Sequence, residues 1–258
     1  MTAILTHEAV RDAVRDAGRA LGLPEPVTEG FVRLLRPCLH LCPYEKLPEE
    51  LRTEGARPAA RVGGPAQLPK GVEVPAYVPH ALTIDCAAIP TGILDIAFPA
   101  DGHVAVLTET TADGGFFLHV PTGTDTVERH SPERDDGQTR HGPFPLHAVP
   151  GTTCPSWLDP SHVAEAAAWA EEDAGRTELV DRMVEQVESL VDVDWGHGIQ
   201  LGGHSPAWHD PLEDRGRVLL VALPWGRVSG DDCITYVSGT PEVIAQHRYD
   251  ALAFTVEC

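Results

Sequence analysis

The chain has 258 residues, of which 42% are hydrophobic and 22% are charged, as is usual for a globular protein of one large domain or two small ones. Its 39 acidic and 19 basic residues give a formal net charge of −20. This charge opposes binding to nucleic acids and favours basic partners, or simply keeps the protein soluble. The sequence shows no apolar run of about 18 residues and no signal peptide, so we expect a cytoplasmic protein that does not contact membranes.

Two amphipathic helices are predicted at the amino end. Apolar residues recur at three- and four-residue spacing over residues 7–21 and again over about 25–36. Thr6 can cap the first helix by accepting a free backbone N–H, and Gly22 can end it. We expect this helical hairpin to cover one face of a sheet and, with an extended linker, to form a unit over residues 1–58.

A run of consecutive strands is predicted over residues 81–120. Strands at 93–98, 104–107 and 116–120 are separated by Asp-Gly turns, which favour antiparallel hairpins. The polar stretch 121–145 is expected to be a mobile surface loop.

Helices are expected again from about residue 160 to 191. Gly175 is predicted to break this region into two helices. After the break, apolar residues at helical spacing indicate a helix whose one face packs into the core, with its acidic face in solvent.

Two stretches of the chain share one order of parts. Each opens with a glycine pair, at 63–64 and at 202–203, and continues through an apolar strand. Each closes at a further glycine, Gly92 or Gly230, which lie 28 and 27 residues after Gly64 and Gly203. This agreement predicts an internal duplication, although the same order also occurs in unrelated sheet proteins.

The expected fold class is therefore α+β. Antiparallel sheets would form two pseudo-repeated halves, at about 60–120 and 195–258, with helices at the N-terminus and between the halves.

Three short motifs carry a family resemblance. Residues 63–69 read Gly-Gly-Pro-Ala-Gln-Leu-Pro, residues 200–206 read Gln-Leu-Gly-Gly-His-Ser-Pro, and residues 230–236 read Gly-Asp-Asp-Cys-Ile-Thr-Tyr. In these motifs the chain resembles the YwqG-like family, a bacterial family without an established biochemical role, which usually has Gly where Cys233 stands. The resemblance implies a YwqG-like domain over residues 59–258, and its motifs are structural rather than chemical.

The six cysteines are expected to be free thiols. They are Cys38, Cys42, Cys86, Cys154, Cys233 and Cys258. Disulfides are unusual in a chain of this length that carries no export signal. Cys38, His40 and Cys42 alternate along a predicted strand, about 6.6–6.8 Å apart, which is too wide for consecutive ligands of one zinc ion. We interpret them as buried thiols and a half-buried histidine rather than a metal site.

The most site-like cluster surrounds the second glycine pair. The candidate ligand-binding residues, which combine aromatic walls with polar groups, are Trp195, His197, Gln200, His204, Trp208 and Asp231. The candidate ligands for zinc or another divalent metal are His197, His204, His209 and Asp210, although their spacing matches no standard metal site. A turn-rich surface loop with histidines is the third interpretation, and a backbone-bonded turn is the alternative for Asp231.

Ser205 nearly fits the nucleophile elbow of serine hydrolases. The elbow uses the backbone N–H after the serine in its oxyanion hole, and Pro206 has none. We therefore predict a turn role for Ser205.

No persuasive catalytic set emerges from the sequence. The leading hypothesis is a non-enzymatic bacterial binding module for a basic protein or a small polar ligand, including an immunity-type protein that neutralises a basic toxin. The alternatives are a metal-binding protein or metal-dependent enzyme that uses the histidine cluster, and a structural or assembly protein.

Overall fold

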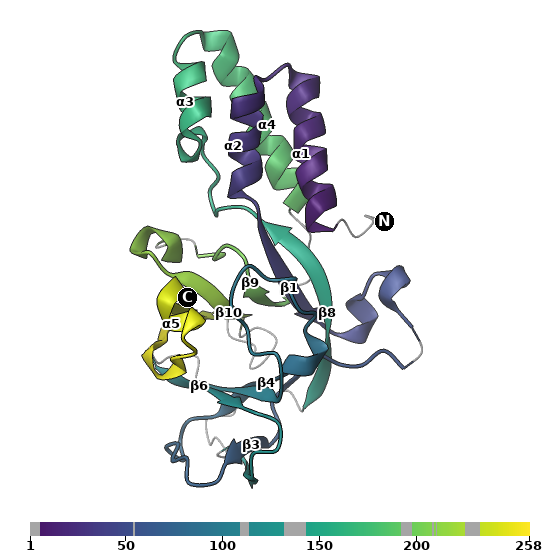
Figure 1. The fold of residues 1–258 in the computed structure, drawn as a ribbon, viewed down its shortest axis with the longest axis vertical. Coiled ribbons are helices and arrows are strands. Elements are labelled where there is room, and N and C mark those ends of the chain that lie inside the picture. Colours follow the sequence, from purple (N-terminus) through teal and green to yellow (C-terminus); the bar gives the residue numbers. More distant parts are fainter. Residues whose placement is uncertain are drawn as a thin grey trace.

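The computed structural model describes residues 6–53, 55–108, 114–131, 143–191, 198–207, 209, 211–224 and 233–258. The α-helices are α1 (His7–Leu21), α2 (Glu25–Leu34), α3 (Ala164–Ala170), α4 (Ala174–Val191) and α5 (Pro241–Ala245). The strands are β1 (Arg36–Cys42), β2 (Ala60–Val62), β3 (Ala66–Pro69), β4 (His80–Asp85), β5 (His103–Thr108), β6 (Gly115–Val120), β7 (Thr126–Arg129), β8 (Phe144–Thr153), β9 (Ile199–Gly202), β10 (Val218–Pro224), β11 (Ile234–Gly239) and β12 (Ala253–Glu257). Figure 1 shows helices α1 to α4 standing together above the strands.

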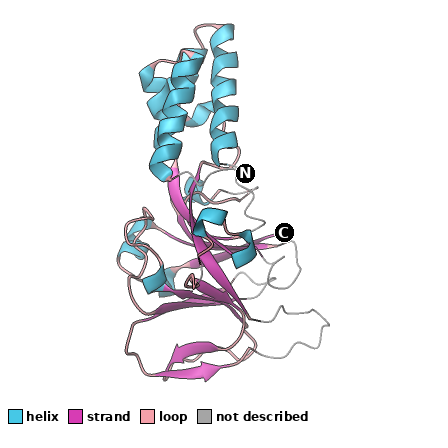
Figure 2. Cartoon of the chain, turned by 90° about the vertical axis from the view of Figure 1, so that its right-hand side faces the viewer, coloured by secondary structure: helices cyan, strands magenta, loops and turns pink. Residues whose placement is uncertain are grey.

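The helical tier, α1 to α4, has a core of its own. Thr6 caps α1 as predicted, accepting from the Ala9 N–H at 3.2 Å, and Gly22 closes the helix with a φ of 72°. The apolar faces of α1 and α2 pack against α3 and α4 through side chains such as Val14, Phe31 and Met183. The prediction that the hairpin covers a sheet face is therefore wrong, because α3 and α4 bury its apolar surface. Figure 2 shows the long helices gathered at one end of the molecule, beyond the strands.

The break between α3 and α4 lies slightly before its predicted position. Gly175 is in the first turn of α4, and its N–H donates to the Asp173 carboxylate at 2.7 Å.

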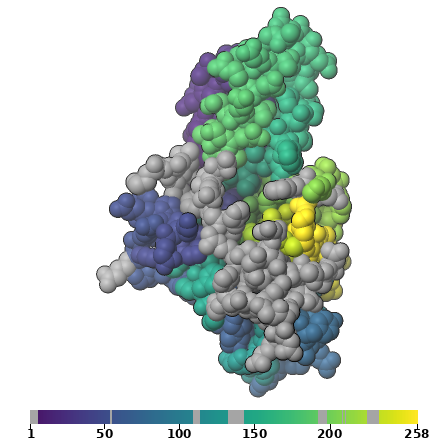
Figure 3. Space-filling model, turned by 180° about the vertical axis from the view of Figure 1, so that it is seen from behind, coloured from purple at the N-terminus to yellow at the C-terminus, as the bar shows by residue number. Residues whose placement is uncertain are grey.

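The helical tier projects from the rest of the molecule in the space-filling view (Figure 3). None of the described helices is both long and apolar enough to cross a membrane.

Ten strands form one sheet in the order β12-β11-β10-β9-β1-β8-β2-β4-β5-β6. All neighbours in this order run antiparallel. With the helices, this sheet confirms the α+β class. The strand β1, which lies within the expected N-terminal unit, occupies the middle of the sheet between β9 and β8.

The sheet is rolled so that its two edge strands approach each other. Phe254 of β12 lies against Gly115 of β6, where an added Cβ would be only 2.6 Å from the Phe254 ring. The rings of Phe117 and Tyr249 meet nearby, with centroids 5.0 Å apart. Both halves of the sheet therefore contribute to one core, and the C-terminal segment lies beside β6 in Figure 1.

The prediction of a strand at residues 93–98 is wrong. These residues form turns and bends, yet their apolar side chains pack onto the core of the rolled sheet. Leu94 approaches Gly202 at the end of β9, and Asp95 holds Arg36 at 2.7 and 3.1 Å. A run of apolar residues of this kind has the same sequence pattern whether it forms a buried strand or a buried irregular segment.

A small second sheet covers part of the outer face of β5 and β6. Strand β3 pairs with β7, and Ala66 and Leu68 pack onto Ala105 and Leu107. Part of the stretch expected to be a loop, residues 121–145, is therefore ordered as β7, whereas residues 132–142 lie outside the described residues.

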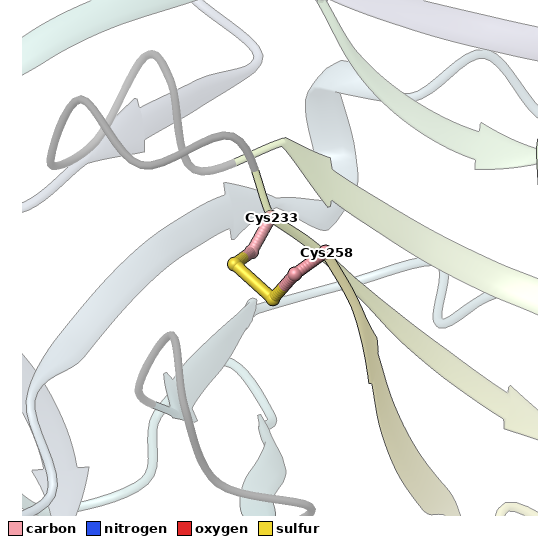
Figure 4. The surroundings of a disulfide bond; sticks show 2 residues. All are labelled: Cys233 and Cys258. Atoms are coloured by element: carbon pink, nitrogen blue, oxygen red, sulfur yellow. A yellow bond between two sulfur atoms is a disulfide. The ribbon is translucent and has the colours of Figure 1, made fainter.

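A disulfide joins Cys233 to Cys258 (Figure 4). The expectation that all six cysteines are free thiols is wrong for this pair, although the other four are free. The pairing of β11 with β12 explains the bond, because Ile234 lies opposite Glu257 and places the two adjoining cysteines side by side.

Candidate functional site

The structure describes only part of the predicted site. Gln200, His204 and His209 are described. The other candidates lie outside the described residues, and they are Trp195, His197, Trp208, Asp210, Asp231 and Asp232. The site as a whole therefore stays a prediction, and the three described residues show what this region does.

Gln200 stabilises the turn of the second glycine pair. Its side-chain amide nitrogen donates to the carbonyl oxygens of Gly202 and His204, both at 2.8 Å. The residue is buried, so these bonds satisfy N–H donors that would otherwise cost free energy. The amide nitrogen of Gln200 is therefore engaged within the turn.

His204 joins the end of α2 to the sheet. Its Nε2 donates to the Leu34 carbonyl at 2.7 Å, while its Nδ1 lies 3.5 Å from Glu213 and has no hydrogen-bond partner. The Ser205 N–H donates to the same Glu213 oxygen at 2.9 Å. Burial opposes ionisation of Glu213, yet the neighbouring His204 ring and the bond from the Ser205 N–H hold the pKa of its carboxyl below the ordinary value.

His209 contacts a different carboxylate. Its Nδ1 lies 3.2 Å from one oxygen of Glu257, whose other oxygen accepts from the Tyr236 hydroxyl at 3.0 Å. Burial, with this bond, raises the pKa of Tyr236. Within the described part of the chain, no group of three or more His, Cys, Asp or Glu side chains could hold a metal ion.

Cys38 is a buried thiol beside the half-buried ring of His40. The Cys38 sulfur lies 3.3 Å from His40 Nε2, a geometry that resembles a nucleophile beside a base. Burial raises the pKa of the Cys38 thiol, however, and burial lowers the pKa of His40 to about 4. Cys42 is likewise a buried thiol outside the disulfide, so the predicted buried thiols are confirmed.

Ser205 has the predicted turn role. Its hydroxyl accepts from the Ala207 N–H at 3.2 Å, and its side chain is 1% exposed. A buried hydroxyl bonded to the chain two residues on is typical of a turn and not of an exposed nucleophile.

A polar hollow of about 450 Å³ lies elsewhere, on the outer face of the sheet. The sheet forms its floor, and Gln67 and Thr126 of the small β3–β7 sheet and the turn at 121–124 form its walls. We call it the outer-face hollow, and its floor consists of Arg61, Thr83, Asp85 and His103.

The strand register gathers these four floor residues. Arg61 of β2 lies opposite Thr83 of β4, and Asp85 of β4 lies opposite His103 of β5. Opposed residues project to the same face, so three strands contribute to one polar cluster. These four residues were not predicted as a site from the sequence, although Thr83 and Asp85 interrupt an apolar strand at alternate positions.

The floor carries opposite charges at its two ends. Arg61 donates to the Pro65 carbonyl at 2.5 Å and has no carboxylate partner among the described residues. Asp85 accepts from the Ala87 N–H at 3.1 Å and from the Arg57 guanidinium. Each Asp85 oxygen therefore has one partner and keeps a further lone pair.

A buried histidine orients the Thr83 hydroxyl. His80 is 4% exposed, and its Nδ1 lies 3.0 Å from the Gly64 carbonyl, so this nitrogen carries the proton. Its Nε2 then accepts from Thr83 Oγ1 at 2.9 Å. Burial lowers the pKa of His80, which keeps the ring in this neutral form at neutral pH.

The wall at 121–124 is fixed by close backbone contacts. Gly102 has a φ of 71°, and an added Cβ there would collide with the Val120 carbonyl. The Asp101 carboxylate accepts from the Thr122 N–H at 3.1 Å. The turn is thereby held over the floor, as a preorganised site requires.

A second, smaller hollow of about 180 Å³ lies between β1, β8 and the segment around residue 57. Its lining is mostly apolar, with side chains such as Leu39 and Leu47. It offers few groups that could orient a polar ligand.

No model of a known protein family matches the chain, and no curated protein matches it either. The resemblance to the YwqG-like family accordingly stays a prediction.

Proposed function

We propose that the protein is a non-enzymatic binding module that holds a small polar ligand in the outer-face hollow. The observation that carries the proposal is the Arg61 guanidinium, which forms no ion pair with a described residue, beside hydroxyl, imidazole and carboxylate groups in one concave site. The volume of about 450 Å³ falls in the range of about 300–1,000 Å³ that is usual for ligand pockets.

A basic protein is the other partner considered, including the target of an immunity-type protein. It is supported by the net charge of −20 alone, which equally serves solubility. The small-ligand proposal is preferred because it has a defined site.

The metal-binding alternative has less support. His204 and His209 contact different carboxylates, Glu213 and Glu257, and a joint site would depend on His197 and Asp210. No observation on the described residues favours it over the ligand-binding proposal.

We also propose that the sheet consists of two related halves. The strands β2, β4, β5 and β6 form one antiparallel meander, and β9 to β12 form another, on either side of β8 and β1. The glycine pair 63–64 directly follows β2, and the pair 202–203 lies at the end of β9, so each pair closes the first strand of its meander. All four glycines have φ values between 61° and 73°. On this proposal β5, and not residues 91–98, corresponds to β11, and the β3–β7 sheet is an addition to the first half that creates the hollow.

Membership of the YwqG-like family, with its bacterial origin, remains part of the proposal. A cytoplasmic location has weaker support, because the disulfide between Cys233 and Cys258 is typical of oxidising compartments.

The test is ligand-observed NMR with a panel of sugars, amino acids, organic acids and nucleosides. Thr122→Trp places a large ring in the wall of the hollow, and Thr53→Trp is its control at an exposed threonine outside the hollow. We expect saturation transfer to at least one probe, lost in Thr122→Trp and kept in Thr53→Trp. Transfer to no probe, or equal transfer in both variants, would refute the proposal.

A further inference from the structure

We infer that the ligand of the outer-face hollow is a short amino acid zwitterion whose carboxylate and ammonium groups are separated by several bonds. The inference rests on the proposed function and adds the chemistry of the ligand. It follows from which groups on the floor can donate hydrogen bonds and which can only accept them.

The Arg61 end of the floor donates. The guanidinium carries five N–H groups and no acceptor, and one nitrogen is engaged with the Pro65 carbonyl. Among the described residues, no carboxylate forms an ion pair with it. A carboxylate is the ligand group that matches a guanidinium best in charge and shape.

The other end of the floor accepts. Thr83 gives its hydroxyl proton to His80, so only its oxygen lone pairs remain for a ligand. His103 donates from Nε2 to the Gln67 carbonyl at 2.8 Å, and in the tautomer that this bond selects Nδ1 is an acceptor. Asp85 adds carboxylate oxygens that keep free lone pairs.

Three acceptors lie at this end, one of them a carboxylate that also pairs with Arg57, and together they favour a ligand group with several donors. An ammonium group offers three N–H donors and a positive charge, and it can satisfy several acceptors from one position. A hydroxyl group has a single proton and would leave acceptors in the hollow without a partner.

The positions of the two charges set the length of the ligand. Asp85 is two residues along β4 from Thr83, which is the residue opposite Arg61. Arg61 and Asp85 are therefore diagonal neighbours, about 7–8 Å apart at the backbone. In an α-amino acid both charged groups share one carbon, so a longer separation fits this pair better.

The charge of the whole protein points the same way. A net charge of −20 repels a free organic anion from the surface. A zwitterion has no net charge, so it can bring a carboxylate to Arg61 without that general repulsion.

Calorimetric titration with a series of probes tests the inference. Glycine, β-alanine, γ-aminobutyrate and 5-aminovalerate carry both charges at increasing separation, while butyrate and butylamine each carry one. We expect the tightest binding for a member longer than glycine, at least about tenfold tighter than butyrate or butylamine.

Two variants separate the roles of the ends. Arg61→Gln is expected to reduce γ-aminobutyrate binding to the level of butylamine and to leave butylamine unchanged. Asp85→Asn, which keeps the cap on Ala87, is expected to reduce it to the level of butyrate and to leave butyrate unchanged. If either residue had only a structural role, its substitution would weaken the binding of every probe. If Arg61→Gln does not fold, Arg61→Lys replaces it, because lysine keeps the charge but not the paired N–H groups that bind a carboxylate, so γ-aminobutyrate binding is again expected to fall.

The outcomes distinguish the inference from the function. If no zwitterion binds more tightly than butyrate and butylamine, while ribose or another neutral probe binds and is blocked in Thr122→Trp, the inference is wrong and the proposed function stands. If no probe of either kind binds, both are wrong.

Discussion

Phe254 on β12 packs directly against Gly115 on β6, and this contact brings the two edges of the ten-stranded sheet together. An added Cβ at Gly115 would lie 2.6 Å from the Phe254 ring and 2.7 Å from the Leu107 carbonyl. The Leu107 carbonyl is part of the backbone of β5, so it cannot move without shifting that strand. The closeness of the two edges therefore depends on a residue without a side chain at position 115.

Gly115→Val is accordingly expected to destabilise the protein by about 1–3 kcal/mol, the usual cost of an overpacked core. Urea unfolding measures the change. Gly114→Val is the matched control, because nothing lies within 4 Å of a Cβ at the neighbouring position. Equal losses of stability in the two variants would show that the edges do not depend on this contact.

Gly102 and Gly123 give a second matched pair at the wall of the outer-face hollow. Both have positive φ values, 71° and 84°, so alanine costs about 1–2 kcal/mol of backbone strain at either site. Only at Gly102 would the added Cβ also strike the Val120 carbonyl. We expect Gly102→Ala to lower the free energy of unfolding more than Gly123→Ala does, and a larger loss at Gly123 would contradict this geometry.

The disulfide between Cys233 and Cys258 closes a segment of 25 residues by sequence separation. A loop of this length predicts that Cys258→Ser lowers the free energy of unfolding by about 3 kcal/mol. Guanidinium unfolding measures the loss, and Cys154→Ser, which removes a free cysteine, is the control.

Alkylation in denaturant without reductant tests the bond itself. We expect four modified cysteines before reduction and six afterwards. Six modified cysteines before reduction would contradict the pairing.

His40 makes stability depend on pH. Burial lowers the pKa of its ring to about 4, from about 6.5 in the unfolded chain. The folded state therefore binds fewer protons, and stability is full above about pH 6.5 and falls as the pH drops toward 4. The loss is on the order of 2–3 kcal/mol, and the lowered pKa of His80 adds to it in the same direction.

Urea unfolding between pH 7 and 5 measures this dependence, at pH values where the acidic groups remain ionised. His40→Gln is expected to flatten the curve, and His130→Gln, at an exposed histidine, is expected to leave it unchanged. An unchanged slope in His40→Gln would show that the buried ring does not carry this dependence.

The local signals of the sequence were sufficient for the helices. The spacing of apolar residues over 7–21 and the cap at Thr6 depend only on neighbouring residues, and α1 has these bounds. The partner of that helix could not be predicted in the same way. The choice between a sheet face and the helices α3 and α4 is made by residues more than a hundred positions away.

The candidate site and the disulfide were missed because both depend on strand register. Arg61, Thr83 and His103 belong to three strands, and only their pairing puts them on one face. Cys233 and Cys258 likewise become neighbours through the pairing of β11 with β12. The alternation of Thr83 and Asp85 within an apolar strand was the one local sign of the site.

Backbone amide NMR during titration with γ-aminobutyrate locates the bound ligand on the chain. If the ligand occupies the outer-face hollow, saturable shift changes are expected at Thr83, His103 and Gly123, which line it. Shift changes confined to the second glycine pair around Gln200 and His204, or no saturable change at all, would contradict the proposed site.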